Sequence, residues 1–243
     1  MTMAFDPVRN RTVLFGGVVP ATGMTTNQVW EWDGSTWTQR VVGGVAPAAR
    51  TGHVMAWDAA RERMIVYGGG TPFPANDTWE LGPGGWKLLD SEGPGPRLNA
   101  SAAYDSARAG VVLFGGSSQS LGRSDNSTWL WDGRTWKEVA PTAPPAQVER
   151  TSVVFDDATG EIVMLGTIYS ANRGVHAWDG ARWRLATFGA PNFSGDHLAY
   201  DPVRQVAVLV GRTSGGIFIP DNQPPQPGRT RGRRGSRSRS CRS

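Results

Sequence analysis

The chain has 243 residues, enough for one large domain or two small ones, and its 39% hydrophobic residues with 11 Trp can form a buried core. Its 32 Gly and 17 Pro indicate many turns between short strands. Cys241 is the single cysteine, which excludes an intrachain disulfide, and no segment approaches the roughly 18 apolar residues of a membrane span. The net charge of +4 is local: residues 229–243 hold seven Arg and no acid, so the other residues carry −3, and a nucleic-acid-binding surface along the whole chain is not supported.

The first predicted elements lie in residues 3–17, "MAFDPVRNRTVLFGG". An apolar strand ends in an aromatic residue and Asp6, whose side chain can accept backbone N–H groups and start a turn. A β-branched strand follows and ends in Gly-Gly. After a polar loop over 18–27, two further strands are predicted at 28–32 and 36–41. We call these four strand positions a, b, c and d.

The hexapeptide "WDGSTW" at 32–37 joins positions c and d, and it returns as "WDGRTW" and "WDGARW". Asp-Gly between two apolar runs predicts a two-residue hairpin turn with positive φ at both residues. That register pairs Trp30 with Trp37 and Trp32 with Ser35. The second unit has Gly82-Pro83 instead and needs a different turn. The same count predicts the pairs Trp79–Trp86, Trp129–Trp136 and His176–Trp183 in the later units.

The four-strand unit repeats along the chain. The acids that follow strand a recur every 45 to 52 residues, at Asp6, Asp58, Asp105, Asp156 and Asp201. The tryptophans of position d recur every 47 to 50 residues, at Trp37, Trp86, Trp136 and Trp183. Residues whose positions are set by a repeat are most simply explained by packing. We therefore predict that the tryptophans pack in the core, rather than stack on sugars or catalyse a reaction.

These units resemble the kelch repeat. They share its Gly-Gly doublet after strand b, the aromatic residue of strand c, the Trp of strand d and an Arg before strand a (Arg50, Arg97 and the displaced Arg150). The resemblance covers residues 3 to about 221. It implies an all-β, kelch-type β-propeller with four full four-stranded blades plus a partial fifth. We expect a propeller over 1–221 and a disordered Arg/Ser/Gly/Pro-rich tail over 222–243.

Kelch-type rings usually close with six or seven blades. The fifth unit here has strands a, b and a short c but lacks the Trp of position d. We therefore expect this chain to be a piece of a longer protein. Exposed blade faces are also expected to make it associate when it is produced alone.

Some proteins with kelch-type propellers are enzymes, and the galactose oxidases are the family to compare. The resemblance to that family would imply a copper ion held by Tyr and His side chains and a Tyr cross-linked to Cys. Residues 1–221 contain no Cys, so that arrangement is excluded. The sialidase Asp-box needs one more residue between Asp33 and Gly34. His53 and His197 both lie where the chain enters strand a, so a metal site with two histidines is conceivable. The repeated acids after strand a could mimic a carboxylate cluster, but turn formation explains them. We predict no enzyme, no catalytic residue, no cofactor and no metal.

Strand direction alternates, so the b–c and d–a loops meet at one end of the propeller, and loops on a rigid scaffold commonly carry recognition. We predict a non-catalytic binding scaffold that holds a protein or peptide partner on this face. The alternative is a carbohydrate or cell-surface binding propeller, and nucleic acid could bind only through the basic tail. The contact candidates are Met24, Phe73, Arg123, Tyr169 and Arg173.

Overall fold

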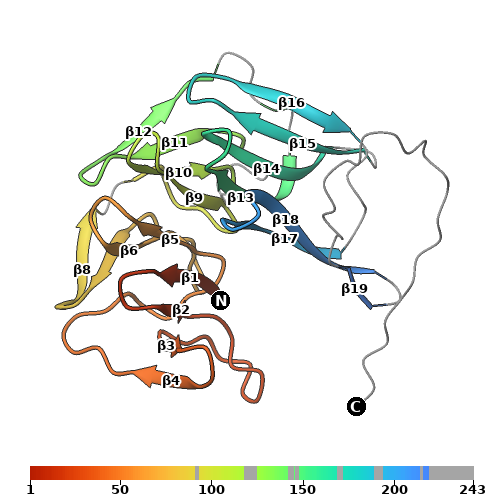
Figure 1. Cartoon of the computed structure of the whole chain (residues 1–243). Coiled ribbons are helices and arrows are strands. Elements are labelled where there is room, and N and C mark those ends of the chain that lie inside the picture. Colours follow the sequence, from red (N-terminus) through yellow and green to blue (C-terminus); the bar gives the residue numbers. More distant parts are fainter. Residues whose placement is uncertain are drawn as a thin grey trace.

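The computed structural model describes residues 1–90, 93–117, 125–141, 145, 148–168, 172–188, 194–213 and 216–218. Every regular element in these ranges is a β-strand, and the strands form five antiparallel sheets arranged around a centre (Figure 1). Four sheets have four strands and the fifth has three. The predicted kelch-type architecture, with four full blades and a partial fifth, is confirmed. The predicted tail over 222–243 lies outside the described residues.

Each full blade places its strands in the order a, b, c, d. The first blade contains β1 (Thr2–Asp6), β2 (Arg11–Phe15), β3 (Val29–Trp32) and β4 (Trp37–Arg40). The second contains β5 (Val54–Asp58), β6 (Arg63–Tyr67), β7 (Thr78–Gly82) and β8 (Gly85–Asp90). The third contains β9 (Ser101–Asp105), β10 (Gly110–Phe114), β11 (Thr128–Trp131) and β12 (Trp136–Val139).

The fourth blade has longer strands: β13 (Val148–Asp156), β14 (Glu161–Ile168), β15 (Asn172–Trp178) and β16 (Trp183–Phe188). The fifth sheet contains β17 (Ser194–Asp201), β18 (Val206–Thr213) and β19 (Gly216–Phe218). The a strands pack in sequence, β1 on β5, β5 on β9, β9 on β13 and β13 on β17. No helix among the described residues is long and apolar enough to cross a membrane.

The repeated Asp closes each a–b turn. In the third blade, Asp105 Oδ1 accepts a hydrogen bond from the backbone N–H of Arg108 at 3.1 Å, and its other oxygen binds the Arg108 guanidinium at 2.6 Å. Asp58 and Arg61 pair in the same way at 2.8 Å. The predicted turn-forming role of these acids is confirmed. Four of the carboxylates, those of Asp6, Asp58, Asp105 and Asp201, pair with the arginine of their own turn, whereas the turn after Asp156 contains no arginine.

The c–d turn differs from the predicted one. Trp32 pairs with Trp37, so the connection has four residues and the register is shifted from the prediction. Asp33 Oδ1 accepts the backbone N–H groups of both Ser35 and Thr36 at 2.8 Å, and Gly34 takes a φ of 103°. The physical reason is the carboxylate: by binding two amides, it stabilises a longer turn than the two-residue hairpin that Asp-Gly alone predicts.

The same correction applies to the later blades. The predicted pairs of Trp129 with Trp136 and of His176 with Trp183 are wrong; the structure pairs Trp131 with Trp136 and Trp178 with Trp183. In the second blade, Leu81 rather than Trp79 faces Trp86. The c–d turn of that blade has two residues, Pro83 and Gly84, and so differs from the four-residue turns of the other blades. A different turn was predicted for this blade.

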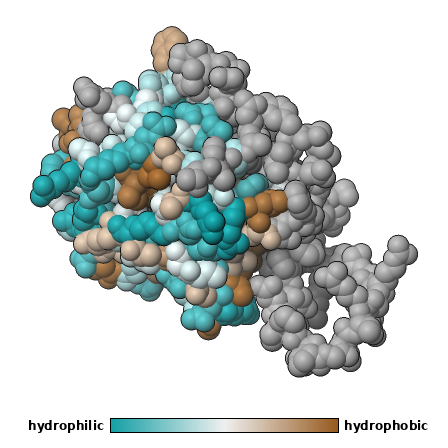
Figure 2. Space-filling view, turned by 90° about the horizontal axis from the view of Figure 1, so that it is seen from above, coloured by the Kyte–Doolittle hydropathy of each residue, from teal (hydrophilic) through white to brown (hydrophobic). Residues whose placement is uncertain are grey.

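The core is divided into clusters that lie between adjacent blades. Trp131 and Trp178 are fully buried in the second and third of these clusters. The position-d tryptophans also reach across: Trp136 Nε1 donates to Thr78 Oγ1 of the preceding blade at 2.9 Å. Packing by the repeated tryptophans is thus confirmed in the second, third and fourth blades, whereas Trp37 of the first blade is 42% exposed. On the coloured part of the face seen from above, the hydrophobic patches are small and lie among hydrophilic residues (Figure 2).

Candidate functional site

The b–c and d–a loops meet at one end of the propeller, as predicted. The backbone N–H of Gly17 donates to Arg50 O at 2.9 Å, and that of Gly69 donates to Arg97 O at 2.9 Å. The Gly-Gly doublets allow this crossing because a Cβ on Gly69 would lie only 2.6 Å from the backbone N of His53. The doublet therefore joins a b–c loop to the d–a segment that runs over it.

Arg50 fixes the second b–c loop from beneath. Its buried guanidinium donates to Gly68 O at 2.8 Å and binds both carboxylate oxygens of Asp77, at 2.6 and 2.8 Å. The indole N–H of Trp79 also donates to Asp77 at 2.6 Å. Burial opposes ionisation of Asp77, but the hydrogen bonds from Arg50 and Trp79 outweigh it and hold the pKa of this carboxyl below its ordinary value.

Arg97 repeats this arrangement at the next blade. Its buried side chain donates to Gly115 O at 2.9 Å and to Ser127 Oγ at 3.3 Å, and it pairs with Asp125 at 3.3 Å. The arginines that precede strand a therefore hold the loop bases in place. Because their donors are used within the fold, they are supports of the loop face and not contact residues.

Two of the five predicted contact residues have described side chains. Met24 is 68% exposed and Phe73 is 72% exposed, each on the b–c loop of its blade, the first and the second. Arg123 and Tyr169 lie outside the described residues. Arg173 lies in β15, paired with Thr167 of β14, and its side chain lies outside the described part of the structure.

The predicted b–c loop over 167–173 is shorter in the structure, because β14 runs to Ile168 and β15 begins at Asn172. In the first three blades the Gly-Gly doublet takes positive φ and ends strand b. The fourth unit has Thr167 in place of the second Gly, so the strand continues. The fifth unit has Arg212 at this position, and β18 likewise continues to Thr213.

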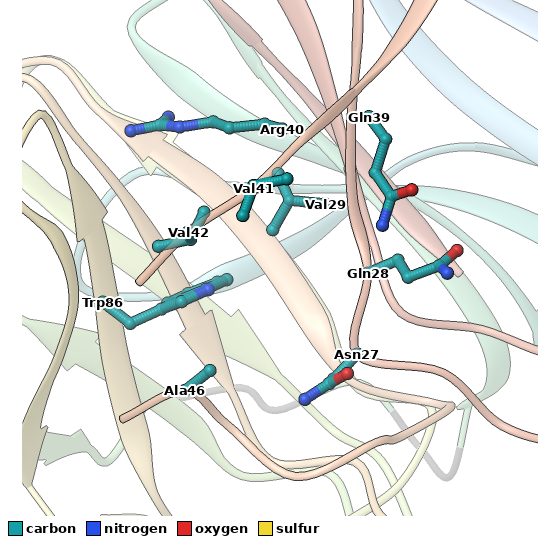
Figure 3. Close-up of a pocket in the computed structure, with 9 residues that line it drawn as sticks. All are labelled: Asn27, Gln28, Val29, Gln39, Arg40, Val41, Val42, Ala46 and Trp86. Atoms are coloured by element: carbon teal, nitrogen blue, oxygen red, sulfur yellow. The ribbon is translucent and has the colours of Figure 1, made fainter. Parts of the chain in front are cut away.

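A pocket of about 190 Å³ opens beside the loop face, between the outer part of the first blade and Trp86 of the second (Figure 3). Val29, Val42 and Ala46 give it an apolar side, and amide side chains line the rest (Figure 3). Arg40 at its edge binds Glu31 at 3.2 Å and Gly82 O at 2.8 Å. No sequence pattern indicates this pocket, because it depends on how segment 41–46 folds toward Trp86.

The described residues offer little acid–base or metal chemistry. His53 is buried with its ring centroid 5.1 Å from that of Phe15, and burial, followed by repulsion from the N-terminus and Arg50, lowers its pKa to about 3. His197 lies on β17 of the fifth sheet. Within the described ranges, no three His, Cys, Asp or Glu side chains are close enough together to hold a metal ion.

The repeated blades and the buried tryptophans between them define a kelch-type propeller. A family model described as the KLHDC2/KLHL20/DRC7 Kelch-repeats domain matches residues 2–183, about three quarters of the chain. The chain belongs to the kelch-repeat family.

Curated relatives match parts of the chain. The Rab9 effector protein with kelch motifs of Bos taurus is 33% identical over 119 residues, 45% of this chain and 32% of that protein. The serine/threonine-protein phosphatase BSL2 of Arabidopsis thaliana is 30% identical over 168 residues, 62% of this chain and 16% of that protein. Dynein regulatory complex subunit 7 of Chlamydomonas reinhardtii is 29% identical over 116 residues, 45% of this chain and 10% of that protein. This chain spans a third or less of the length of these relatives.

Two solved structures share the fold at 13% sequence identity. YjhT superposes with a TM-score of 0.61, over 90% of this chain and 83% of that one. TolB from Acinetobacter baumannii superposes with a TM-score of 0.59, over 90% of this chain and 51% of that one. At this identity the likeness concerns the fold alone.

Proposed function

We propose that this chain is a non-catalytic scaffold that holds a protein or peptide partner on the face formed by the b–c and d–a loops. The observation that carries the proposal is the exposure of Met24 and Phe73 at the tips of loops whose bases are fixed. Large apolar side chains on a pre-organised surface bind well because little conformational entropy is lost on association. The ion pair of Arg50 with Asp77 provides that rigidity beneath Phe73.

The pocket beside Trp86 supports the same interpretation. It lies where the end of the first b–c loop meets the segment that leads to the second blade. Interface energy is commonly concentrated where one side chain enters a small pocket. We infer that a partner places an apolar side chain there while Met24 contacts the surrounding surface. Phe73 would extend the contact area over the second blade.

The names of the relatives agree with an interaction role. One is a Rab9 effector and another is a subunit of a dynein regulatory complex. The phosphatase relative does not argue for catalysis here, because the match covers only 16% of that protein. Four of the repeated acids pair with the arginine of their own turn, and His53 is buried. Binding is therefore the use that the described chemistry favours.

The partner-binding unit is residues 1–221, and the polar segment 222–243 is a separate extension in this proposal. The extension contains seven Arg and could attract nucleic acid through charge. The propeller itself does not share this bias, because it carries a net negative charge. Partner capture by the 1–221 fragment, tested beside the full chain, separates the two contributions.

The first prediction tests the loop face by affinity capture from the cells that produce the protein. The double variant Met24→Ala, Phe73→Ala should lose at least about tenfold of captured partner, because truncating central apolar contacts typically costs more than 1 kcal/mol each. The matched control is Val8→Ala, Val203→Ala, two exposed apolar residues in a–b turns at the opposite end.

Both double variants should unfold at the wild-type temperature, since exposed substitutions of this kind have small effects on stability. Equal capture by the wild type and the loop-face variant would refute the proposal. Retention on a glycan array with no protein captured would favour the carbohydrate alternative instead.

A further inference from the structure

The three junctions between the four full blades follow one rule. A blade packs the side that carries its position-d Trp against the preceding blade; we call this side its upstream face and the other side its downstream face. The upstream tryptophans are almost completely covered: Trp86 and Trp136 are 9% exposed and Trp183 is 2% exposed. Aliphatic and aromatic side chains of the preceding downstream face provide the cover, as Val13, Phe15 and Val29 do for the second blade.

Two polar contacts complete these junctions. Trp136 Nε1 donates to Thr78 Oγ1 at 2.9 Å, and Trp183 Nε1 donates to Thr128 Oγ1 at 3.0 Å. At the other end of the blades, the arginine of an a–b turn reaches the c–d turn of the next blade. Arg61 donates to the carbonyl of Asp132, and Arg108 donates to the carbonyl of Asp179.

The arginines also explain the glycine of the repeated hexapeptide. A Cβ on Gly133 would collide with the guanidinium of Arg61, and a Cβ on Gly180 would collide with that of Arg108. The guanidinium of Arg108 further lies 5.0 Å from the ring centroid of Trp178. The "WDG" segment is thus both a turn and the place where the preceding blade's arginine binds.

In the first blade, none of the described residues covers the equivalent upstream face. Met3, Phe5 and Trp37 are 56%, 51% and 42% exposed. The register places Met3 beside Leu14 and Leu14 beside Trp30, so these side chains share one side of the sheet. At Gly34 an added Cβ would meet nothing within 4 Å, in contrast to Gly133 and Gly180.

The fifth sheet presents the complementary downstream face. The register places Ala199 beside Val208 and His197 beside Val210, and Val210 is exposed. Arg204 binds Asp201 at 3.0 Å, as Arg61 and Arg108 bind the acids of their own turns, and its side chain is largely exposed. Among the described residues, β17 and β1 make no packing comparable to that between neighbouring blades.

We propose that the upstream face of the first blade binds the downstream face of the fifth sheet of a second copy, head to tail. Val208 and Val210 would then cover Phe5 and Trp37, and Arg204 would reach the carbonyl of Asp33 over Gly34. Such a contact joins two different surfaces and leaves one of each free on the pair, so it can propagate. This contact does not involve the loop face and is independent of the proposed function.

Sedimentation velocity over a range of concentrations tests this second prediction with the full chain. The wild type should form concentration-dependent oligomers. Met3→Glu on the first blade and Val210→Glu on the fifth sheet should each weaken association at least about tenfold, since each places a charge inside an apolar contact. Arg204→Ala should weaken it as well. Val41→Glu, at an exposed position outside both faces, is the control.

Mixing the variants makes the test specific. Met3→Glu keeps the intact fifth sheet and Val210→Glu keeps the intact first blade, so an equimolar mixture should form a complex of two copies while each variant alone stays monomeric. Circular dichroism and thermal unfolding establish that the variants are folded. A wild type that stays monomeric at its highest soluble concentration would overturn the proposal. Undiminished self-association of Val210→Glu, or a mixture that stays monomeric, would also overturn it.

Discussion

His53 shows how a single residue can report on the packing of this propeller. It enters strand a of the second blade, and its ring lies against Phe15 of the first. The sequence placed it beside the repeated strand but could not indicate its burial, because that depends on the neighbouring blade. The environment lowers its pKa to about 3, so the folded protein keeps the ring neutral at mild acidity.

The third prediction is a pH dependence of stability from this histidine. Below about pH 6.5 the unfolded chain takes up a proton on His53 and the folded protein does not. The contribution of neutral His53 to the free energy of unfolding is therefore fully present above pH 6.5 and is lost as the pH falls toward about 3. The loss is at most about 1.4 kcal/mol per pH unit.

Urea unfolding between pH 7 and pH 4 measures the effect. The variant His53→Gln should reduce the pH slope by about one proton, whereas Val203→Ala, at an exposed turn position without a titratable group, should leave it unchanged. An NMR titration that gave His53 a pKa near 6.5 in the folded protein would contradict the account.

Among the structural elements, strand b of the first three blades ends at the Gly-Gly doublet. The missing side chains of this doublet leave room for the d–a segment that passes over it. The fourth prediction compares Gly69→Ala with Gly34→Ala, which both require positive φ. Gly69→Ala should destabilise the protein by about 3 kcal/mol or more, because backbone strain adds to a clash with His53. Gly34→Ala should cost only about 1–2 kcal/mol from strain, since its surroundings are open.

Chemical denaturation of the two variants provides the measurement. Equal losses of stability would show that the close approach at Gly69 contributes nothing beyond the φ requirement. Val203→Ala, at an exposed turn position, gives the baseline for a neutral substitution.

Much of the order of the strands was predictable, because the strand unit and the acid after its first strand recur five times along the chain. The alternation of apolar residues and the acid after strand a were sufficient to place the strands and the a–b turns. The c–d register was not predictable from Asp-Gly alone, since the Asp33 carboxylate binds Ser35 and Thr36 and lengthens the turn. The end of strand b in the fourth blade depended on the replacement of one Gly by Thr167.

The candidate site was predictable only in outline. Loop length and position indicated Met24 and Phe73, which are exposed on the expected face. The supports of these loops were visible as repeated arginines, but the partners Asp77 of Arg50 and Asp125 of Arg97 could be identified only from the folded b–c loops. The pocket at Trp86 depends on two blades and one connecting segment, and no local pattern records such an arrangement.

At the scale of the whole molecule, four junctions connect five sheets, and the loops share one end. The repeated tryptophans and arginines hold the blades together, while the loops differ from blade to blade. In the functions proposed above, the repeated residues build the scaffold and the non-repeated residues of the loops provide its recognition surface. Partner binding and self-association would then use different surfaces of one molecule.

The fifth prediction tests the central claim, that the loop face binds the partner. Hydrogen–deuterium exchange of the protein, alone and with its captured partner, locates the contact along the chain. We expect slower exchange on binding in the b–c loops 18–27 and 71–77, and unchanged exchange in the a–b turns around Val8 and Val203. Protection confined to those turns, with no change in the two loops, would contradict the account.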